Sequence, residues 1–245
     1  MLITSMENDK IKKYLRLQQR KYREEQKEFI VEGMHLVLEA YKKGLIVEVI
    51  LQADEVIPLN CPIVYVPKKI IEKLSSVETP QHVLALCKMS EETEKFGDKI
   101  LIVDEVQDPA NLGSIVRSAV AFDVDTIILS KNTVDLYNPK TIRTTQGMLF
   151  HVNILKNIDI VEIIKKIKQE EIPVYGTKVG YGDDVKKLTE KDKKRYALVV
   201  GNEGQGVREV VSDLCDKHLY IHLNDHVESL NVGVATSILL YELRR

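Results

Sequence analysis

Apolar and polar residues follow two periods in the C-terminal part of the chain. From residue 100 onward, short apolar runs typical of buried strands alternate with stretches in which apolar residues recur every three or four positions, as in helices. The expected strands are KILIV, TIILS, HVNIL, IPVYGT, YALVVG and HLYIHL. Helices are expected from Asn111, after residues 138–139, over residues 159–170 and 208–217, and from about Glu228 to the end. This alternation predicts an α/β domain, a mostly parallel sheet with helices on both faces.

The N-terminal part predicts a smaller α/β unit. Residues 28–44 predict a helix ending at Gly44, a residue type common just after helix C-termini. LIVEVILQ, PIVYVP and VLALCK then predict three strands, and the polar, acid-rich residues 89–99 predict a linker. The expected organisation is a helical arm over residues 1–27, a small domain over 28–88, the linker, and a second domain over 100–245.

The N-terminal arm is strongly basic. Residues 10–23 hold seven Lys or Arg and no acidic residue, with Tyr14 and Tyr22 among them. One interpretation is an RNA-binding helix that contacts phosphates through Lys12, Lys13, Arg16 and Arg20. The other is a solvated basic helix balanced by Glu24, Glu25 and Glu28.

Composition narrows the class of protein. The chain has 245 residues, 44% of them hydrophobic, and no apolar run of the length that a membrane span needs. The N-terminus lacks a secretory signal, and three distant cysteines indicate free thiols, so we expect a cytoplasmic protein. A net charge of −2 is unlike that of a nucleic-acid coat protein, so any contact with a polyanion must be local.

Three segments at the ends of expected strands carry polar residues. In the first, Asn111, Ser114 and Arg117 are spaced three apart at the start of a helix, where α/β proteins present groups to ligands. Either they form a stripe facing a ligand, or Asn111 is a helix N-cap and Arg117 a solvated helix residue. The third segment, residues 223–242, opens a strongly apolar helix, and taken alone it is a capped C-terminal helix.

The second segment, VVGNEGQGV, surrounds Glu203 with three glycines. Glycines at such a turn let the backbone approach a ligand closely. The G-x-x-G-x-G spacing, late in the domain, differs from the G-x-G-x-x-G of a dinucleotide-binding turn and argues against a nicotinamide cofactor. A purely structural turn is the remaining alternative.

Taken together, NLGSIVRSA, VVGNEGQGV and SLNVGVATSIL resemble, in order, spacing and residue types, the three signature motifs of the SpoU (TrmH-like) branch of the SPOUT RNA methyltransferases. Residues 138–154 resemble the family's stretch between the first two motifs. FIVEGMHLVLEA and TPQHVLAL resemble the L30e-like substrate-binding domain, related to a ribosomal protein, that precedes the catalytic domain in many members. The resemblance covers nearly the whole chain.

The resemblance implies methyl transfer from S-adenosylmethionine to a ribose 2′-hydroxyl of structured RNA, without a metal. Ribosomal RNA is favoured over transfer RNA because the two-domain layout resembles rRNA-directed members. The family implies a deep C-terminal trefoil knot, which apolar periodicity does not reveal, and a homodimer. The alternative is an RNA-binding protein that keeps the fold without methyl transfer.

The resemblance also assigns roles to residues. It implies a catalytic group of Arg117, Asn111, Glu203, Ser229 and Asn231, and a cofactor site of Gly201, Gly206, Ile221, Leu223 and Leu230. Arg143 is expected to contact RNA phosphate. The family casts the arginine as general base, but a guanidinium with a pKa above ~12 rarely loses its proton. We therefore expect Arg117 to orient the hydroxyl and a neighbouring phosphate.

The sequence departs from the family pattern in a few places. His222, Leu223 and Asp225 stand where Pro, Met and Gly are common, Gly233 replaces a small hydroxyl residue, and His82 replaces Gly. The carboxylate of Asp225 is expected to alter cofactor affinity if it points inward. A zinc site is a competing interpretation of Cys215, His218, His222 and His226. It is disfavoured because HLYIHL predicts a strand, in which the histidines do not share one helical face.

Overall fold

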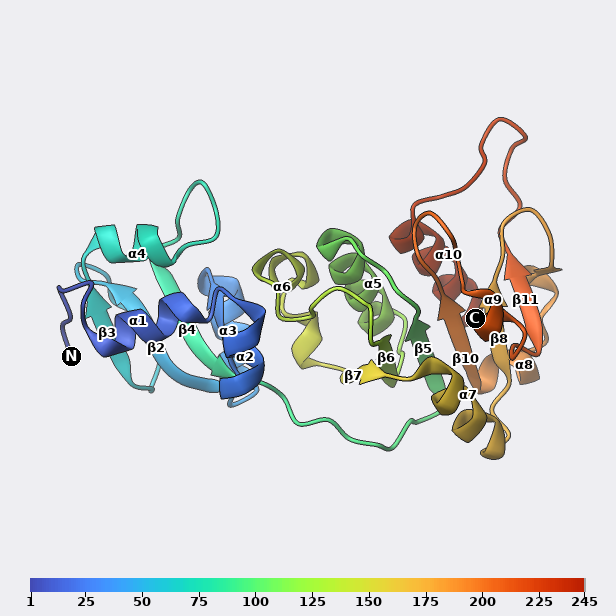
Figure 1. Ribbon diagram of the computed structural model, residues 1–245, viewed down its shortest axis with the longest axis horizontal. Helices are drawn as coiled ribbons and strands as arrows, with labels where there is room; N and C mark the ends of the chain where they lie inside the picture. Colours follow the sequence, from blue (N-terminus) through green and yellow to red (C-terminus); the bar gives the residue numbers. More distant parts are fainter. Residues whose placement is uncertain (245) are drawn as a thin grey trace. The chain divides into compact units, whose positions relative to one another are not determined.

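The computed structural model describes residues 1–244 and divides into two compact units (Figure 1). The first comprises Met1–Glu91 and Asp135–Phe150, and the second comprises Glu92–Val134 and the chain from His151 onward. The first unit is therefore built from two separate stretches of sequence, which the expected boundary near residue 100 does not anticipate.

The first unit contains a four-stranded sheet in the order β1-β4-β2-β3. These strands are β1 (Glu28–Glu32), β2 (Ile46–Gln52), β3 (Ile63–Val66) and β4 (Val83–Lys88), flanked by α3 (Met34–Lys42) and α4 (Lys68–Leu74). The helix expected over residues 28–44 is wrong in its first part. Residues 28–32 alternate between half-buried and buried positions and pair antiparallel with β4, and Gly33, at φ +96°, separates this strand from α3.

The N-terminal helices α1 (Asp9–Arg16) and α2 (Arg20–Gln26) are part of the first unit. Ile11, Tyr14 and Leu17 are buried in the same apolar cluster as the sheet residues. The Tyr14 hydroxyl donates a hydrogen bond of 2.7 Å to the carboxylate of Glu48 on β2. The basic arm is therefore an integral layer of this unit, and its apolar face is not available to a ligand.

The second stretch of the first unit holds α6 (Pro139–Thr145) and a short 3-10 turn, Met148–Phe150. The ring of Phe29 on β1 lies 4.6 Å from that of Tyr137 and 6.1 Å from that of Phe150. The buried guanidinium of Arg23 donates to the carbonyls of residues 17 and 18 and, at 2.5 Å, to the carboxylate of Asp135. Aromatic burial and this ion pair tie residues 135–150 to the first unit.

The second unit contains an all-parallel sheet of seven strands in the order β7-β6-β5-β10-β8-β11-β9. Its strands are β5 (Lys99–Val103), β6 (Thr126–Ser130), β7 (Asn153–Ile158), β8 (Val174–Thr177), β9 (Asp183–Asp184), β10 (Tyr196–Val200) and β11 (Lys217–Tyr220). The parallel sheet expected from the apolar runs is confirmed.

Helices cover both faces of this sheet. Ile100 and Ile102 of β5 share an apolar cluster with α7 (Ile160–Gln169) and α9 (Glu209–Ser212). Leu101 and Val103, which alternate with them, point to the opposite face, where α5 (Pro109–Ala121) packs against α10 (Val232–Arg244). A 3-10 turn, Val185–Lys187, and α8 (Glu190–Lys194) lie between β9 and β10.

The segment between β11 and α10 is a long excursion without helix or strand (Figure 1). The strand expected through residue 223 ends at Tyr220, and the last helix, expected from about Glu228, begins at Val232. The cause of the later start is Asn231, whose Oδ1 accepts hydrogen bonds from the backbone N–H groups of Gly233 and Val234.

We predict that Asp135→Ala lowers the free energy of unfolding by about 3–5 kcal/mol, because it leaves the buried guanidinium of Arg23 without its carboxylate. Glu24→Ala is the control, since the Arg20–Glu24 pair is about half exposed and its loss is expected to cost less than about 1 kcal/mol. Urea unfolding followed by circular dichroism measures both. Equal losses for the two variants would contradict the role of this ion pair in anchoring residues 135–150.

Candidate functional site

Side chains from the three polar segments meet at the carboxyl edge of the second unit's sheet. The Asn111 Nδ2 donates to Oε1 of Glu203 at 2.9 Å, and the Asn231 Nδ2 donates to Oδ1 of Asn111 at 2.8 Å. Glu203 and Asn231 lie 92 and 120 positions from Asn111 in the sequence, and all three side chains share one hydrogen-bonded chain. The structure brings together three of the five expected catalytic residues.

The start of α5 places Asn111 in this chain. Asp108 is the N-cap, since its side chain accepts from the backbone N–H groups of Ala110 at 2.6 Å and Asn111 at 3.1 Å. Pro109 occupies the first helical position, where it needs no hydrogen-bond donor. The alternative in which Asn111 is the N-cap is therefore wrong, and its amide is free to reach across to the neighbouring loops.

Glu203 connects the second polar segment to the first. Its carboxylate accepts from the backbone N–H groups of Gln107 at 3.3 Å and Asp108 at 3.2 Å, as well as from Asn111. Partial burial acts to raise the pKa of this carboxyl, but these hydrogen bonds outweigh it and hold the pKa below its ordinary value. Glu203 is thus kept ionised at neutral pH and acts only as an acceptor. It therefore holds the segment before α5, and Asn111 itself, against the loop of residues 202–206.

The start of α10 packs closely on α5. A Cβ at Gly233 would lie 3.3 Å from the Cβ and Oγ of Ser114, and the hydroxyls of Ser118 and Ser237 are 2.7 Å apart. Glycine at position 233, where the family has a small hydroxyl residue, thus allows this approach. Two positions of the polar stripe, Asn111 and Ser114, therefore face the third segment.

A pocket of ≈ 610 Å³ opens beside this hydrogen-bonded chain. Its lining includes all five expected cofactor residues and the expected catalytic residue Ser229, namely Gly201, Gly206, Ile221, Leu223, Leu230 and Ser229. Glu203 lines the pocket as well, so its carboxylate belongs both to the hydrogen-bonded chain and to the pocket lining. Of the residues that depart from the family pattern, His222, Leu223 and Asp225 also line it.

Two glycines shape the pocket wall. The backbone groups of Asn202 and Gly206 exchange hydrogen bonds of 2.9 Å, which folds residues 202–206 into a tight turn. A Cβ at Gly201 would lie 2.1 Å from the carbonyl carbon of Gly206, and Gly206 itself has φ +71°. Only glycine fits at the first position without moving the backbone. Residues 201–206 therefore form a tight glycine-containing turn along one side of the pocket.

Arg117 is exposed on α5 and forms no side-chain hydrogen bond or ion pair within residues 1–244. Its guanidinium is thus uncompensated by any carboxylate of the described chain. Arg143 belongs to the first unit, where it donates to the Ser76 hydroxyl at 2.7 Å. The roles expected for both arginines stay predictions.

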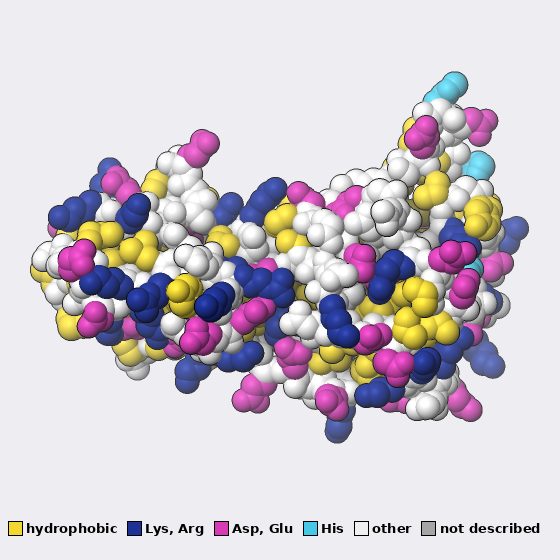
Figure 2. Space-filling view, in the orientation of Figure 1, with side chains coloured by type: hydrophobic (Ala, Val, Ile, Leu, Met, Phe, Trp, Pro, Cys, Tyr) yellow, Lys and Arg dark blue, Asp and Glu magenta, His cyan; other side chains and the backbone are white. Residues whose placement is uncertain are grey.

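The basic helices of the first unit are partly neutralised. Lys12 pairs with Glu7 at 2.7 Å, Lys13 with Glu28 at 2.6 Å and Arg20 with Glu24 at 2.6 Å. The Arg16 guanidinium and the Lys21 ammonium instead lie 5.8 and 5.9 Å from the centre of the Tyr22 ring. Figure 2 shows Lys and Arg side chains over this part of the unit with acidic side chains among them.

Two residues of the competing zinc interpretation, Cys215 and His218, have other partners. His218 Nε2 is 2.7 Å from the Ser212 hydroxyl, and the Cys215 thiol lies 3.4 Å from the Val211 carbonyl. In residues 1–244 no group of three or more His, Cys, Asp or Glu side chains is placed to hold a metal ion. The same residues contain no helix long and apolar enough to cross a membrane.

Sequence reasoning missed one pair at this edge. Asp104 follows β5 directly and is fully buried, and Arg208 follows the glycine-containing turn and bonds to it. An acidic residue immediately after an apolar strand was the available signal, but its partner lies 104 positions away.

The parallel sheet, the polar chain and the pocket at its carboxyl edge define the class: this is an α/β methyltransferase domain of the SPOUT type. The profile of the SpoU rRNA methylase family matches residues 98–241, and the chain belongs to this family. Residues 8–85 match the MRM3-like substrate-binding domain. The expected α/β fold, with a parallel sheet and a small N-terminal domain, is thereby confirmed.

Similar proteins extend over the whole chain. A 23S rRNA (guanosine(2553)-2′-O)-methyltransferase, RlmP of Bacillus subtilis, is 37% identical over 99% of this chain and 98% of its own length. The crystal structure of an RNA 2′-O ribose methyltransferase matches with a TM-score of 0.83 and 28% identity, covering 99% and 98% of the two chains. An AdoMet-bound rRNA methyltransferase from Sinorhizobium meliloti matches with a TM-score of 0.87 and 26% identity, covering 100% and 97%.

The pocket fits S-adenosylmethionine, the methyl donor of this family. Its wall combines the main chain of the glycine turn with aliphatic side chains such as Ile221 and Leu230, which suits a nucleoside bound largely by backbone groups. The carboxylates of Glu203 and Asp225 on the lining suit a cofactor that carries a sulfonium and an ammonium group.

We predict that Gly201→Ala weakens binding of S-adenosylhomocysteine at least about tenfold, because the new Cβ would overlap the backbone of Gly206 and Val207 and so must displace the turn that lines the pocket. Gly204→Ala in the same turn is the control. Its Cβ would meet only the Asn202 side chain, at 3.6 Å, and we expect affinity close to that of the unchanged protein. Calorimetric titration measures both affinities. Equal values for the two variants would show that the turn is not part of the cofactor site.

Proposed function

We propose that this protein transfers a methyl group from S-adenosylmethionine to a ribose 2′-hydroxyl of 23S ribosomal RNA, at the guanosine that its Bacillus subtilis relative modifies. The observation that carries the proposal is the Asn231–Asn111–Glu203 chain beside the pocket. Similarity to the 23S rRNA relative over 99% of the chain supports the substrate. With this substrate, the proposed place of action is the cytoplasm.

The cofactor supplies an electrophilic methyl group, which must lie in line with the ribose oxygen. Asn111 helps to define where that oxygen sits. Because ionised Glu203 only accepts hydrogen bonds, it fixes the amide nitrogen of Asn111 toward itself and the amide oxygen toward Asn231. The second amide hydrogen and the remaining lone pair of Asn111 then have fixed directions toward a substrate.

Arg117 orients the substrate in this proposal. Its guanidinium lacks an intramolecular counter-ion within the described chain, so its full charge is available to an RNA phosphate and to the ribose oxygen. A guanidinium cannot accept the hydroxyl proton at neutral pH. Arg117 would instead orient the hydroxyl and stabilise the negative charge that develops on its oxygen, with the hydroxyl proton going to solvent.

The proposed assembly is a homodimer, as in the family. On α10, Val234 and Tyr241 keep 49% and 40% of their surface exposed in the single chain. A second copy covering this helix would bury both side chains. The third polar segment lies at the start of the same helix, so the site would border the interface.

We predict that the protein transfers tritiated methyl groups to 23S rRNA lacking this modification, and that Arg117→Ala lowers transfer by about 100-fold or more. Affinity for S-adenosylhomocysteine should stay within about threefold, since Arg117 is assigned to the RNA side. Arg195→Ala, at the opposite edge of the sheet, is the control. Primer extension at limiting nucleotide locates the methylated ribose. Binding of cofactor and RNA without transfer to any RNA would favour the alternative, an RNA-binding protein of this fold.

We predict that Arg16→Ala and Lys21→Ala each weaken RNA binding and lower its salt slope by about 0.7–0.9, the value of one phosphate contact. Lys12→Ala is the control, because Glu7 already compensates its charge. Point substitutions are needed because deletion of residues 1–27 would also remove the buried Ile11, Tyr14 and Leu17. Filter binding between low and physiological salt measures the slope. Equal slopes for the three variants would show that the basic helices do not contact the RNA.

A further inference from the structure

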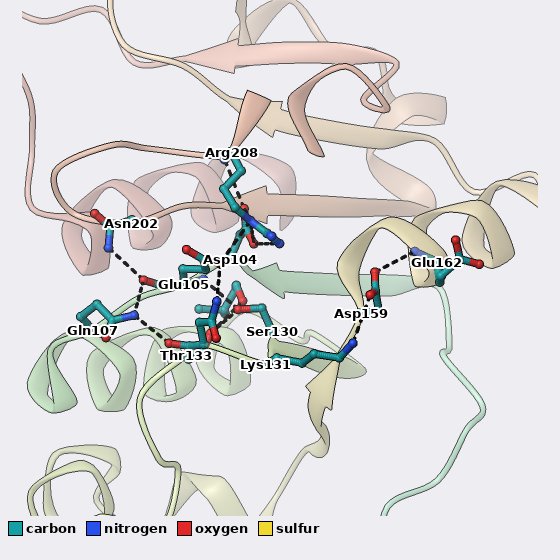
Figure 3. A network of polar contacts seen from close by, with 12 residues as sticks. Asp104, Glu105, Gln107, Ser130, Lys131, Thr133, Asp159, Glu162, Asn202 and Arg208 are labelled. Atoms are coloured by element: carbon teal, nitrogen blue, oxygen red, sulfur yellow. Dashed lines mark hydrogen bonds and ion pairs between the residues drawn. The ribbon is translucent and has the colours of Figure 1, made fainter. Parts of the chain in front are cut away.

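An ion pair between the fully buried Asp104 and the partly exposed Arg208, whose side chain keeps 36% of its surface accessible, joins the segment that leads to Asn111 to the loop that carries Glu203. The carboxylate of Asp104, which has no exposed surface, accepts from Arg208 Nη2 at 2.6 Å and from Nε at 3.0 and 3.1 Å. The backbone N–H of Arg208 donates to the same carboxylate at 3.2 Å. Figure 3 shows the Arg208 side chain reaching across to the end of β5.

A second set of contacts runs beside this pair. The Asn202 Nδ2 donates to the Glu105 carbonyl at 3.0 Å, while its Oδ1 accepts from the backbone N–H groups of Gly204 and Gln205. Glu105 has φ +62°, a conformation that L-residues seldom adopt, and its carboxylate lies 3.5 Å from Arg208 Nε. Figure 3 shows these side chains in one network with Gln107. The strained turn at Glu105 directs its carbonyl toward Asn202.

The same loop serves both halves of the reaction. Residues 201–207 line the pocket, and Glu203 within them holds Asn111. Neither Asp104 nor Arg208 is among the residues that line the pocket. The pair therefore acts on the site only through the two loops that it joins.

We propose that Asp104 and Arg208 are a positioning pair for methyl transfer: they fix the cofactor-binding loop against the loop that presents Asn111. This inference rests on the proposed function. A bidentate pair resists both sliding and rotation of one loop past the other, which a single hydrogen bond does not. Its loss would let the methyl donor and the ribose oxygen drift out of line while each still binds.

The test uses Arg208→Gln and Arg208→Lys in the full-length protein. We expect Arg208→Gln to lower kcat by about tenfold or more, with KM for RNA and affinity for S-adenosylhomocysteine within about threefold. Arg208→Lys should recover part of kcat, because it restores the charge without the bidentate geometry. Amide hydrogen exchange in residues 104–111 and 201–207 should rise in both variants.

Arg195→Gln is the matched control. Arg195 also pairs with a carboxylate, Asp98 at 3.0 Å, but it precedes β10, at the amino edge of the sheet. We expect this variant to keep kcat within about twofold and exchange in the two loops unchanged. An equal loss of kcat in the control would show a general loss of stability and overturn the proposal.

Two further outcomes separate this inference from the proposed function. If the unchanged protein methylates RNA and Arg208→Gln keeps its kcat, the positioning role is wrong and the function stands. If the unchanged protein methylates no RNA, the proposed function fails. Amide hydrogen exchange then still tests whether the Asp104–Arg208 pair holds the two loops. Unchanged exchange in residues 104–111 and 201–207 would then show that the pair does not hold the loops.

Discussion

The parallel pairing of β5 with β10 determines where every other part of the candidate site lies. Val103 pairs with Val200, so the chain leaves both strands at the same level of the sheet edge. The Asp104 N–H still donates to the Val200 carbonyl at 2.8 Å, which extends the contact by one residue. Two loops about 100 residues apart in sequence therefore start side by side, and side-chain contacts between them need only span a few ångströms.

Sequence periodicity predicted the central strands of the second unit well because these strands are buried on both faces. KILIV, TIILS and YALVV match β5, β6 and β10, since continuous apolar runs suit central parallel strands. Sequence periodicity gave the wrong secondary structure or the wrong boundary where contacts between distant parts of the chain determine it. Residues 28–32 form a strand only because β4 lies beside them, and α10 starts at Val232 only because Asn231 caps it.

Part of the site was foreseeable and part was not. Motif resemblance selected Asn111, Glu203 and Asn231, and hydrogen bonds join the three. Resemblance gave no pairing between Asp104 and Arg208, because nothing local distinguishes that aspartate from the acids that follow many strands. An ion pair closed over 104 positions is a property of the folded sheet edge, and a single sequence does not encode it in any short pattern.

The discontinuity of the first unit has a consequence for how the protein is made. On the ribosome, residues 1–91 emerge with Arg23 lacking its carboxylate and with one face of Phe29 uncovered. The partners of both residues, Asp135 and Tyr137, are synthesised only after β5, α5 and β6 of the second unit. The first unit therefore cannot be completed until residues 135–150 have followed the first strands of the second unit, and a fragment that ends at residue 91 would expose a buried charge and an aromatic surface.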